Sequence, residues 1–189
     1  NVSTFSFFGN KTITTGEGGM VASNDKNIID RVASLRNHAQ SDKKYWHEEI
    51  GFNYRMTNIC AAIGLSQMEN INSIVTRKVE IASIYKDLLD SPKIEFQNLE
   101  KNSQSSHWLV SILLNDKSTR DELAKFLEKE GIETRPLFYP ASRMPMYLSD
   151  LSFPVADELS DRGMNLPSFP DLSNSDISYI SGKIKAFLG

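Results

Sequence analysis

The sequence contains a single cysteine, Cys60, so it cannot form an internal disulfide, and such sparse cysteine is typical of a reducing compartment such as the cytoplasm. No apolar run approaches the roughly 18 residues that a membrane-spanning helix requires. Positive charge is not in excess either, with 21 Lys and Arg residues against 24 Asp and Glu residues. We therefore expect a cytoplasmic protein that binds neither a membrane nor nucleic acid.

Metal-binding patterns are also absent. The three histidines, His38, His47 and His107, have no cysteine, aspartate or second histidine at the spacing of a metal site. We expect no metal ion. Residues 38–52, which contain two of these histidines, are polar and show no clear period, and a loop of this length inside a compact domain is usually functional or mobile.

Length and composition indicate an ordinary globular chain. Its 189 residues are 40% hydrophobic and 24% charged, enough for one domain of good size or two small ones. The sequence does not begin with Met, and its opening NVSTFSFF already has the pattern of a strand. We expect it to be a piece of a longer polypeptide.

The residue pattern of the first part of the chain predicts two strands followed by two helices. Residues 2–8 and 20–22 are rich in β-branched and aromatic side chains and predict strands. Residues 27–37 carry apolar side chains at helical spacing. A much longer helical pattern covers residues 57–90 and predicts one continuous helix of about 50 Å at 1.5 Å per residue.

After Pro92 the pattern changes to a small α+β unit. Strands are predicted at 94–96, 107–114 and 132–138, and helices at 118–130, 155–162 and 173–187, with a proline-punctuated segment around the second of these helices. We place the domain boundary inside the long helix, with one domain at 1–80 and a small domain at 81–189. The predicted fold class is α/β.

One lysine stands out from its surroundings. Lys11 lies in FSFFGNKTITTGEGGMV (5–21), between an apolar run and a glycine cluster. Burial among apolar groups can lower a lysine pKa by up to about 3–5 units, which costs free energy while the amine stays charged. Two readings remain open: a structural lysine that reaches the surface from a loop, or an amine that forms a Schiff base with a carbonyl compound.

Four segments, in order, resemble a known family. They are SFFGNK with TTGEGGMV around Lys11, GFNYRMTNICAAIGLSQ at 51–67, GIETRPLFYP at 131–140 and MNLPSFPDLS at 164–173. Together they cover nearly the whole chain and resemble the sugar aminotransferases of the DegT/DnrJ/EryC1/StrS family, which use pyridoxal 5′-phosphate. The first segment and the RPLFYP and PMY motifs are most similar to the perosamine-synthase branch.

The resemblance implies roles for particular residues. Lys11 would be the catalytic residue that binds the cofactor as a Schiff base, and the Ser6 hydroxyl would bind the cofactor phosphate. Asn53 would reach the cofactor phosphate of a neighbouring subunit, which implies a homodimer with shared active sites. Without the resemblance, a strand serine bonded to backbone would be the simpler interpretation of Ser6.

Substrate contacts are implied for four further residues. Tyr54 and Arg55 follow Asn53 directly, and Arg55 has the geometry to bind a phosphate or a carboxylate, or equally a salt-bridge partner within the loop. Arg135 and Tyr139 lie in the segment that approaches the sugar in the family.

The implied reaction transfers an amino group from glutamate to a 4-keto-6-deoxy nucleotide sugar of the perosamine type, for polysaccharide biosynthesis. One alternative is a keto-sugar 3-dehydratase of the same fold that uses pyridoxamine phosphate, but that branch replaces the lysine with histidine. Another is an inactive fragment that serves only as a binding or interaction module.

The resemblance also implies an architecture. The chain would be the C-terminal half of a fold type I aminotransferase, comprising the end of the large domain and the small α+β domain. Further cofactor ligands, among them an aspartate on the pyridine nitrogen, would lie in the other half.

Overall fold

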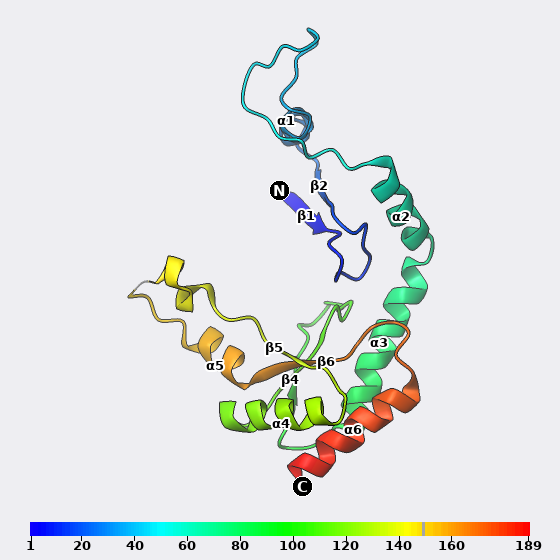
Figure 1. Cartoon of the computed structure of the whole chain (residues 1–189), viewed down its shortest axis with the longest axis vertical. Helices are drawn as coiled ribbons and strands as arrows, with labels where there is room; N and C mark the ends of the chain where they lie inside the picture. Colours follow the sequence, from blue (N-terminus) through cyan, green and yellow to red (C-terminus); the bar gives the residue numbers. More distant parts are fainter. Residues whose placement is uncertain (149) are drawn as a thin grey trace. The chain divides into compact units, whose positions relative to one another are not determined.

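The computed structural model describes residues 1–148 and 150–189 (Figure 1). Internal contacts divide the chain into two compact units, Asn1–Ser73 and Ile74–Gly189. The division falls within helix α3 (Ile71–Leu88). The boundary predicted at residue 80 lies in the same helix, and the assignment of the two parts to a large and a small domain stays a prediction.

The first unit begins with a two-stranded antiparallel sheet. Strand β1 (Val2–Ser6) pairs with β2 (Gly19–Ser23), so that Ser6 lies opposite Gly19 at the end nearest the connecting loop. Helix α1 (Lys26–Arg36) follows directly, because the Asp25 side chain accepts a hydrogen bond from the Asn27 N–H and caps it. These three elements confirm the predicted strands and helix.

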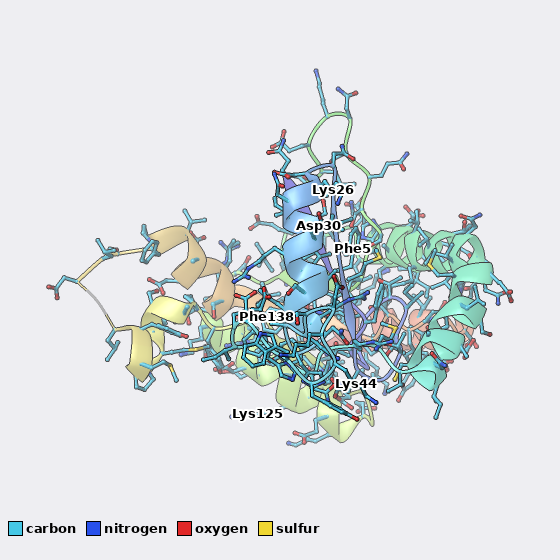
Figure 2. The ribbon with its side chains drawn as sticks, turned by 90° about the horizontal axis from the view of Figure 1, so that it is seen from above. Phe5, Lys26, Asp30, Lys44, Lys125 and Phe138 are labelled. Atoms are coloured by element: carbon cyan, nitrogen blue, oxygen red, sulfur yellow. The ribbon has the colours of Figure 1, made fainter. Side chains whose placement is uncertain are left out.

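Helix α1 also carries an exposed ion pair. Lys26 and Asp30 lie one turn apart on α1 (Figure 2). Their Nζ and Oδ2 atoms are 2.5 Å apart. An exposed pair of this kind contributes little to stability, so α1 is held mainly by its contact with β2.

Residues 37–57 form a long connection. Two isolated antiparallel bridges, Asn37 with Asn53 and Gln40 with His47, fold it back on itself. The backbone of His38 and Ala39 has positive φ, an uncommon conformation for residues with a β-carbon. The connection therefore has a defined path, which returns the chain to the end of α1 before the next helix begins.

The prediction of one continuous helix over residues 57–90 is wrong. The structure has α2 (Asn58–Glu69) and then α3, with Asn70 between them at φ −107° and ψ 7°. The Asn70 amide group also donates to the Ser66 carbonyl oxygen, a competing bond that favours a helix end. Thr57 caps α2 by accepting a hydrogen bond from the Cys60 N–H.

The second unit is built on a four-stranded antiparallel sheet in the order β3-β4-β6-β5. Its strands are short: β3 (Glu95–Phe96), β4 (Val110–Leu113), β5 (Arg135–Pro136) and β6 (Gly163–Leu166). Strand β6 was not predicted, although it is buried along its whole length and pairs with two neighbours. The strand predicted at 132–138 is reduced to the two residues of β5.

Helices α4 (Lys117–Lys129), α5 (Pro154–Arg162) and α6 (Asn174–Leu188) confirm the predicted helices of this unit. Helix α4 contacts both α5 and α6. Two short 3₁₀ helices, η1 (Ala141–Arg143) and η2 (Pro145–Tyr147), occupy the proline-punctuated segment. In Figure 1, α4 and α6 lie side by side in the second unit.

Burial differs sharply between the units. The second unit has a continuous core from α3, the sheet and the helices, with Ile81, Tyr85 and Ile112 among its fully buried residues. Among the described residues of the first unit, only Thr15 and Ala39 are buried. The first unit therefore holds its shape mainly through hydrogen bonds and local packing.

Candidate active site

The loop that carries Lys11 connects β1 to β2 and is closed by its own hydrogen bonds. The Phe7 N–H donates to the Gly18 carbonyl oxygen at 2.9 Å, and the Phe7 carbonyl oxygen accepts from the Thr15 N–H and the Thr14 hydroxyl, each at 2.9 Å. The loop is thus pinched shut at its base. Lys11 lies within the closed part, between Phe7 and Thr15.

Lys11 itself is half-buried, and its backbone N–H donates to the Phe8 carbonyl oxygen at 3.0 Å. The sequence predicted apolar, buried surroundings, and this is wrong for the described structure: Phe5 is 46% exposed and Phe8 is 49% exposed. Aromatic residues therefore flank the loop without enclosing it.

Ser6, the last residue of β1, lies just before this loop. Its Oγ accepts a long hydrogen bond of 3.4 Å from the Phe8 N–H, and the residue is exposed. In the part of the chain that the structure describes, no hydrogen bond uses the hydroxyl hydrogen of Ser6. This hydroxyl can therefore donate to an anion.

The lysine loop is also attached to helix α2. The Gln67 side chain accepts a hydrogen bond from the Thr14 N–H at 3.0 Å and donates one to the Thr14 carbonyl oxygen at 2.5 Å. Gly64, one turn earlier, faces Thr15 so closely that a β-carbon at Gly64 would lie 2.8 Å from the Thr15 methyl group. The sequence analysis placed Gln67 at the end of the second motif and assigned it no functional role.

The second motif lies at the start of α2. Asn53 forms an antiparallel bridge with Asn37, and the next backbone N–H, that of Tyr54, donates to the Arg36 carbonyl oxygen at 3.0 Å. The Arg55 guanidinium donates to Asn37 Oδ1 at 3.4 Å. Main-chain pairing to the end of α1 thus fixes these three residues in a row before the helix.

A cleft of about 740 Å³ lies within the first unit. Its lining combines β1, β2, α1 and the segment before α2: Thr4, Phe5, Glu17, Gly18, Gly19, Met20, Val21, Ile29, Val32, Ala33, Arg36, Tyr54, Arg55, Met56, Thr57 and Cys60. Of the predicted site residues, Tyr54 and Arg55 line it. Ser6, Lys11 and Asn53 do not, so the cleft is not the site that the sequence assigned to the cofactor.

Arg135 and Tyr139 belong to the second unit. The Arg135 guanidinium donates from Nε and Nη2 to Glu133 Oε1, each at 3.2 Å, and both residues of the pair are exposed. Tyr139 is 58% exposed and follows Phe138, whose ring stacks on Trp108 at 6.3 Å between centroids. Both side chains are accessible to a ligand, and their assignment to the sugar stays a prediction.

The second unit also holds a buried cation that the sequence did not single out. Lys78 on α3 is 4% exposed, and its ammonium group donates to the Ser168 carbonyl oxygen at 2.7 Å. Burial lowers the pKa of Lys78. It also lowers the pKa of His107, with the positive charges of Lys86 and Lys78 acting in the same direction. Nothing in the helical pattern distinguishes Lys78 from the exposed lysines around it.

Two further findings concern metal ions and membranes. No group of three His, Cys, Asp or Glu side chains in residues 1–148 and 150–189 could hold a metal ion. Over the same residues, no helix combines the length and apolar character needed to cross a bilayer.

Comparison with known proteins places the chain in a family. A model of the DegT/DnrJ/EryC1/StrS aminotransferase family matches residues 1–185. The chain is 49% identical over 189 residues to a GDP-perosamine synthase of Escherichia coli O157:H7, and this match covers 99% of the chain and 52% of the relative. It is 45% identical to a GDP-perosamine synthase of Vibrio cholerae, over 99% of the chain and 53% of that relative.

Other relatives agree with these two. The chain is 33% identical to a putative pyridoxal phosphate-dependent aminotransferase, EpsN, of Bacillus subtilis, covering 91% of the chain and 46% of the relative. The crystal structure of the aminotransferase TlmJ from Streptoalloteichus hindustanus superposes with a TM-score of 0.93 at 26% identity, covering 100% of the chain and 52% of TlmJ.

The chain spans about half the length of the curated relatives it matches. The match nevertheless runs along almost the entire sequence, and it includes both the loop of Lys11 and the motif before α2. The fold is that of the sugar aminotransferases that use pyridoxal phosphate, and the chain belongs to the DegT/DnrJ/EryC1/StrS aminotransferase family.

Proposed function

We propose that the protein containing this chain is a pyridoxal phosphate-dependent aminotransferase that moves an amino group from glutamate to a GDP-linked 4-keto-6-deoxyhexose. The observation that carries the proposal is the 49% identity to a GDP-perosamine synthase over 99% of the chain. The product would be an amino sugar nucleotide used for polysaccharide biosynthesis. The sparse cysteine supports a cytoplasmic location for the enzyme.

The residues present fit the cofactor. Pyridoxal phosphate needs an amine for its aldehyde and hydrogen-bond donors for its phosphate. Lys11 supplies a half-buried amine in a loop that is closed at its base. Ser6 supplies a hydroxyl group that can still donate a hydrogen bond. Gly9 lies between Ser6 and Lys11 in the sequence, and a β-carbon there would meet no atom within 4 Å. This open space beside the loop supports the assignment.

When bound, pyridoxal phosphate condenses with amines and withdraws electrons from the carbon that carries the amino group. The Lys11 amine would hold the cofactor. Once the amino donor has displaced this amine, it would take the proton from the carbon that carries the amino group, and in the second half of the reaction it would deliver a proton to the acceptor carbon of the sugar. Ser6 holds the phosphate by donating its hydroxyl hydrogen.

Asn53 is proposed to donate its amide hydrogens to the phosphate held by a second copy of the chain. Its backbone is fixed by the bridge to Asn37, which leaves the side-chain amide as the adaptable group. Tyr54 and Arg55 follow it at the cleft of the first unit, and we assign them, with Arg135 and Tyr139, to the nucleotide sugar. This arrangement requires a homodimer.

The proposal is tested with Lys11→Ala in the full-length protein. Incubation with pyridoxal phosphate and borohydride, followed by intact mass and peptide mapping, should show one adduct on Lys11 in the natural protein and none in the variant. Amination of the GDP-linked keto sugar by glutamate should fall at least 10³-fold, by the scale of losing a nucleophile and general base.

Lys26→Ala is the matched control, because Lys26 is an exposed lysine of the same unit. It should keep both the adduct and the activity. An adduct that maps to another lysine, or near-normal amination by Lys11→Ala, would refute the assignment. A natural protein that binds the nucleotide sugar but forms no adduct would instead favour a binding module.

A further inference from the structure

The amide side chain of Gln67 is hydrogen-bonded to both backbone groups of one residue of the lysine loop, Thr14. Its oxygen accepts from the Thr14 N–H at 3.0 Å, and its nitrogen donates to the Thr14 carbonyl oxygen at 2.5 Å. Gln67 and Thr14 are 53 residues apart in sequence. A side-chain amide that pairs with both backbone groups of one residue takes the place of a neighbouring β-strand.

This pair joins the loop to α2 at the point where the loop turns back. The Thr14 hydroxyl donates a hydrogen bond to the Phe7 carbonyl oxygen and accepts one from the Gly16 N–H, each at 2.9 Å. Thr14, held by Gln67, therefore also stabilises the base of the loop. Thr15, buried next to it, donates its hydroxyl to the Glu17 carbonyl oxygen at 2.7 Å. Movement at Thr14 would therefore disturb both arms that hold Lys11.

Close packing also holds the lysine loop against α2 at two other places. A β-carbon at Gly64 would lie 2.8 Å from the Thr15 methyl group, and one at Gly18 would lie 2.9 Å from the Met56 methyl group. Met56 directly precedes the Thr57 cap of α2, and Gly64 and Gln67 are one turn apart within the helix. The loop is thus in contact with α2 from the residue before its cap to its last turn.

We propose that Gln67 is a positioning residue that holds the Lys11 amine in the geometry needed to bond the cofactor aldehyde. The proposal rests on the proposed function for the role of Lys11. Gln67 does not itself touch the reacting atoms. It acts through Thr14, and it ties the lysine loop to α2, which begins three residues after Arg55.

Only an amide satisfies both Thr14 groups. A carboxylate can accept from the Thr14 N–H but would face the Thr14 carbonyl oxygen with a second acceptor. Protonation of that carboxyl restores a donor. Gln67→Glu is therefore a pH-switchable version of the contact, whereas Gln67→Met keeps the length of the side chain and loses both hydrogen bonds.

The test measures amide hydrogen exchange and adduct formation in the full-length protein. In Gln67→Met, exchange of the Phe7, Lys11 and Thr15 amides should speed up roughly tenfold or more, the effect of losing two ordinary hydrogen bonds. The rate at which pyridoxal phosphate becomes trapped on Lys11 by borohydride should fall by a similar factor. Ser66→Ala, at the exposed neighbouring position, should change neither.

Gln67→Glu should behave like Gln67→Met at pH 8 and return toward the natural exchange rates near pH 4, where an ordinary glutamate side chain is mostly protonated, each compared with the natural protein at the same pH. Recovery at the lower pH is the readout that a general packing role would not produce. If Gln67→Met binds the cofactor at the natural rate with unchanged loop exchange, Gln67 does not position Lys11. If the natural protein itself forms no adduct, the proposed function fails instead.

Discussion

The buried ammonium group of Lys78 on α3 donates a 2.7 Å hydrogen bond to the backbone carbonyl oxygen of Ser168. Its neighbours do the same. The Tyr85 hydroxyl donates to the Pro167 carbonyl oxygen at 3.0 Å, and the Arg77 guanidinium donates to the Leu172 carbonyl oxygen at 2.5 Å. Side chains of α3 thus satisfy the carbonyl groups of Pro167, Ser168 and Leu172. These residues follow β6 within the fourth family motif, and they need such partners because they lie beyond the end of the strand.

The first prediction concerns pH and Lys78. Because burial lowers its pKa in the folded protein, the unfolded chain binds more protons between that lowered pKa and the ordinary value of 10.5. The free energy of unfolding should therefore rise with pH across this window. Lys78→Met should remove that part of the slope in urea titrations followed by fluorescence, and Lys125→Met, an exposed lysine on α4, should retain it. Identical slopes in the Lys78 variant and the natural protein would contradict the buried cation.

For Tyr85 we expect the opposite effect: the free energy of unfolding should fall as pH rises at high pH. Burial, with a smaller contribution from the charge of Asp176, raises the pKa of Tyr85 above its usual 10.0. Above pH 10 the unfolded tyrosine ionises while the folded one stays protonated, so stability should fall. Tyr85→Phe should flatten this fall and cost about 1 kcal/mol at pH 7 through the lost bond to Pro167. Tyr179→Phe, a half-exposed tyrosine on α6, is the control and should do neither.

Two glycines in helices make a matched pair. Gly182→Ala on α6 adds a methyl group that meets no atom within 4 Å, so helix propensity alone should stabilise the protein by about 0.8–1 kcal/mol. At Gly64 the same change meets the Thr15 methyl group, and Thr15 is buried with its hydroxyl bonded to Glu17, so the side chain cannot turn away. The clash should cost about 1–3 kcal/mol and outweigh the helix gain.

Trp46 in the first unit and Trp108 in the second allow each change to be followed locally, with the other tryptophan replaced by phenylalanine. Unfolding reported by Trp46 should occur at lower urea in Gly64→Ala. Equal stabilisation by the two alanines would mean that α2 and the lysine loop are not in close contact.

The Arg143 guanidinium predicts a local response to acid. It binds Asp161 through two hydrogen bonds of 2.8 and 3.1 Å, and this contact lowers the pKa of the Asp161 carboxyl below its usual 3.8. This contact of η1 with α5 is therefore complete above pH 3.8 and weakens as pH falls through the lowered value, while the second contact of Arg143, with Asp157, remains. Amide exchange at Met144 and Tyr147 should report it. Arg143→Lys should speed their exchange at pH 7, because an ammonium group cannot make the paired contact, while Arg135→Lys should leave it unchanged.

Local pattern predicted the helices well. Helices α1, α4, α5 and α6 follow the apolar spacing within a residue or two at each end, because each buries or contacts one face. The spacing continued through Asn70, so one helix was predicted where the structure has α2 and α3. The spacing of apolar residues shows which face of a helix would be buried. It does not show where one polar residue, here Asn70, ends the helix.

Strand β6 shows the other limit. Gly163–Leu166 shows no alternation of apolar and polar residues, because all four of its residues are buried. The strand lies between β4 and β5 in the sheet, and it follows α5 without a loop. The residues that pair with it lie 28 and more positions away in sequence. No short-range pattern contains that information.

The sequence by itself determined the family, the lysine of the proposed chemistry and the order of most elements, because these depend on residue type and on spacing along the chain. The tertiary structure alone decided that Gln67 holds Thr14, that Lys78 is buried on Ser168, and that Lys11 is half-buried between exposed aromatic residues. Hydrogen bonds and desolvation depend on which atoms meet in space, and residues far apart in sequence meet only once the chain has folded.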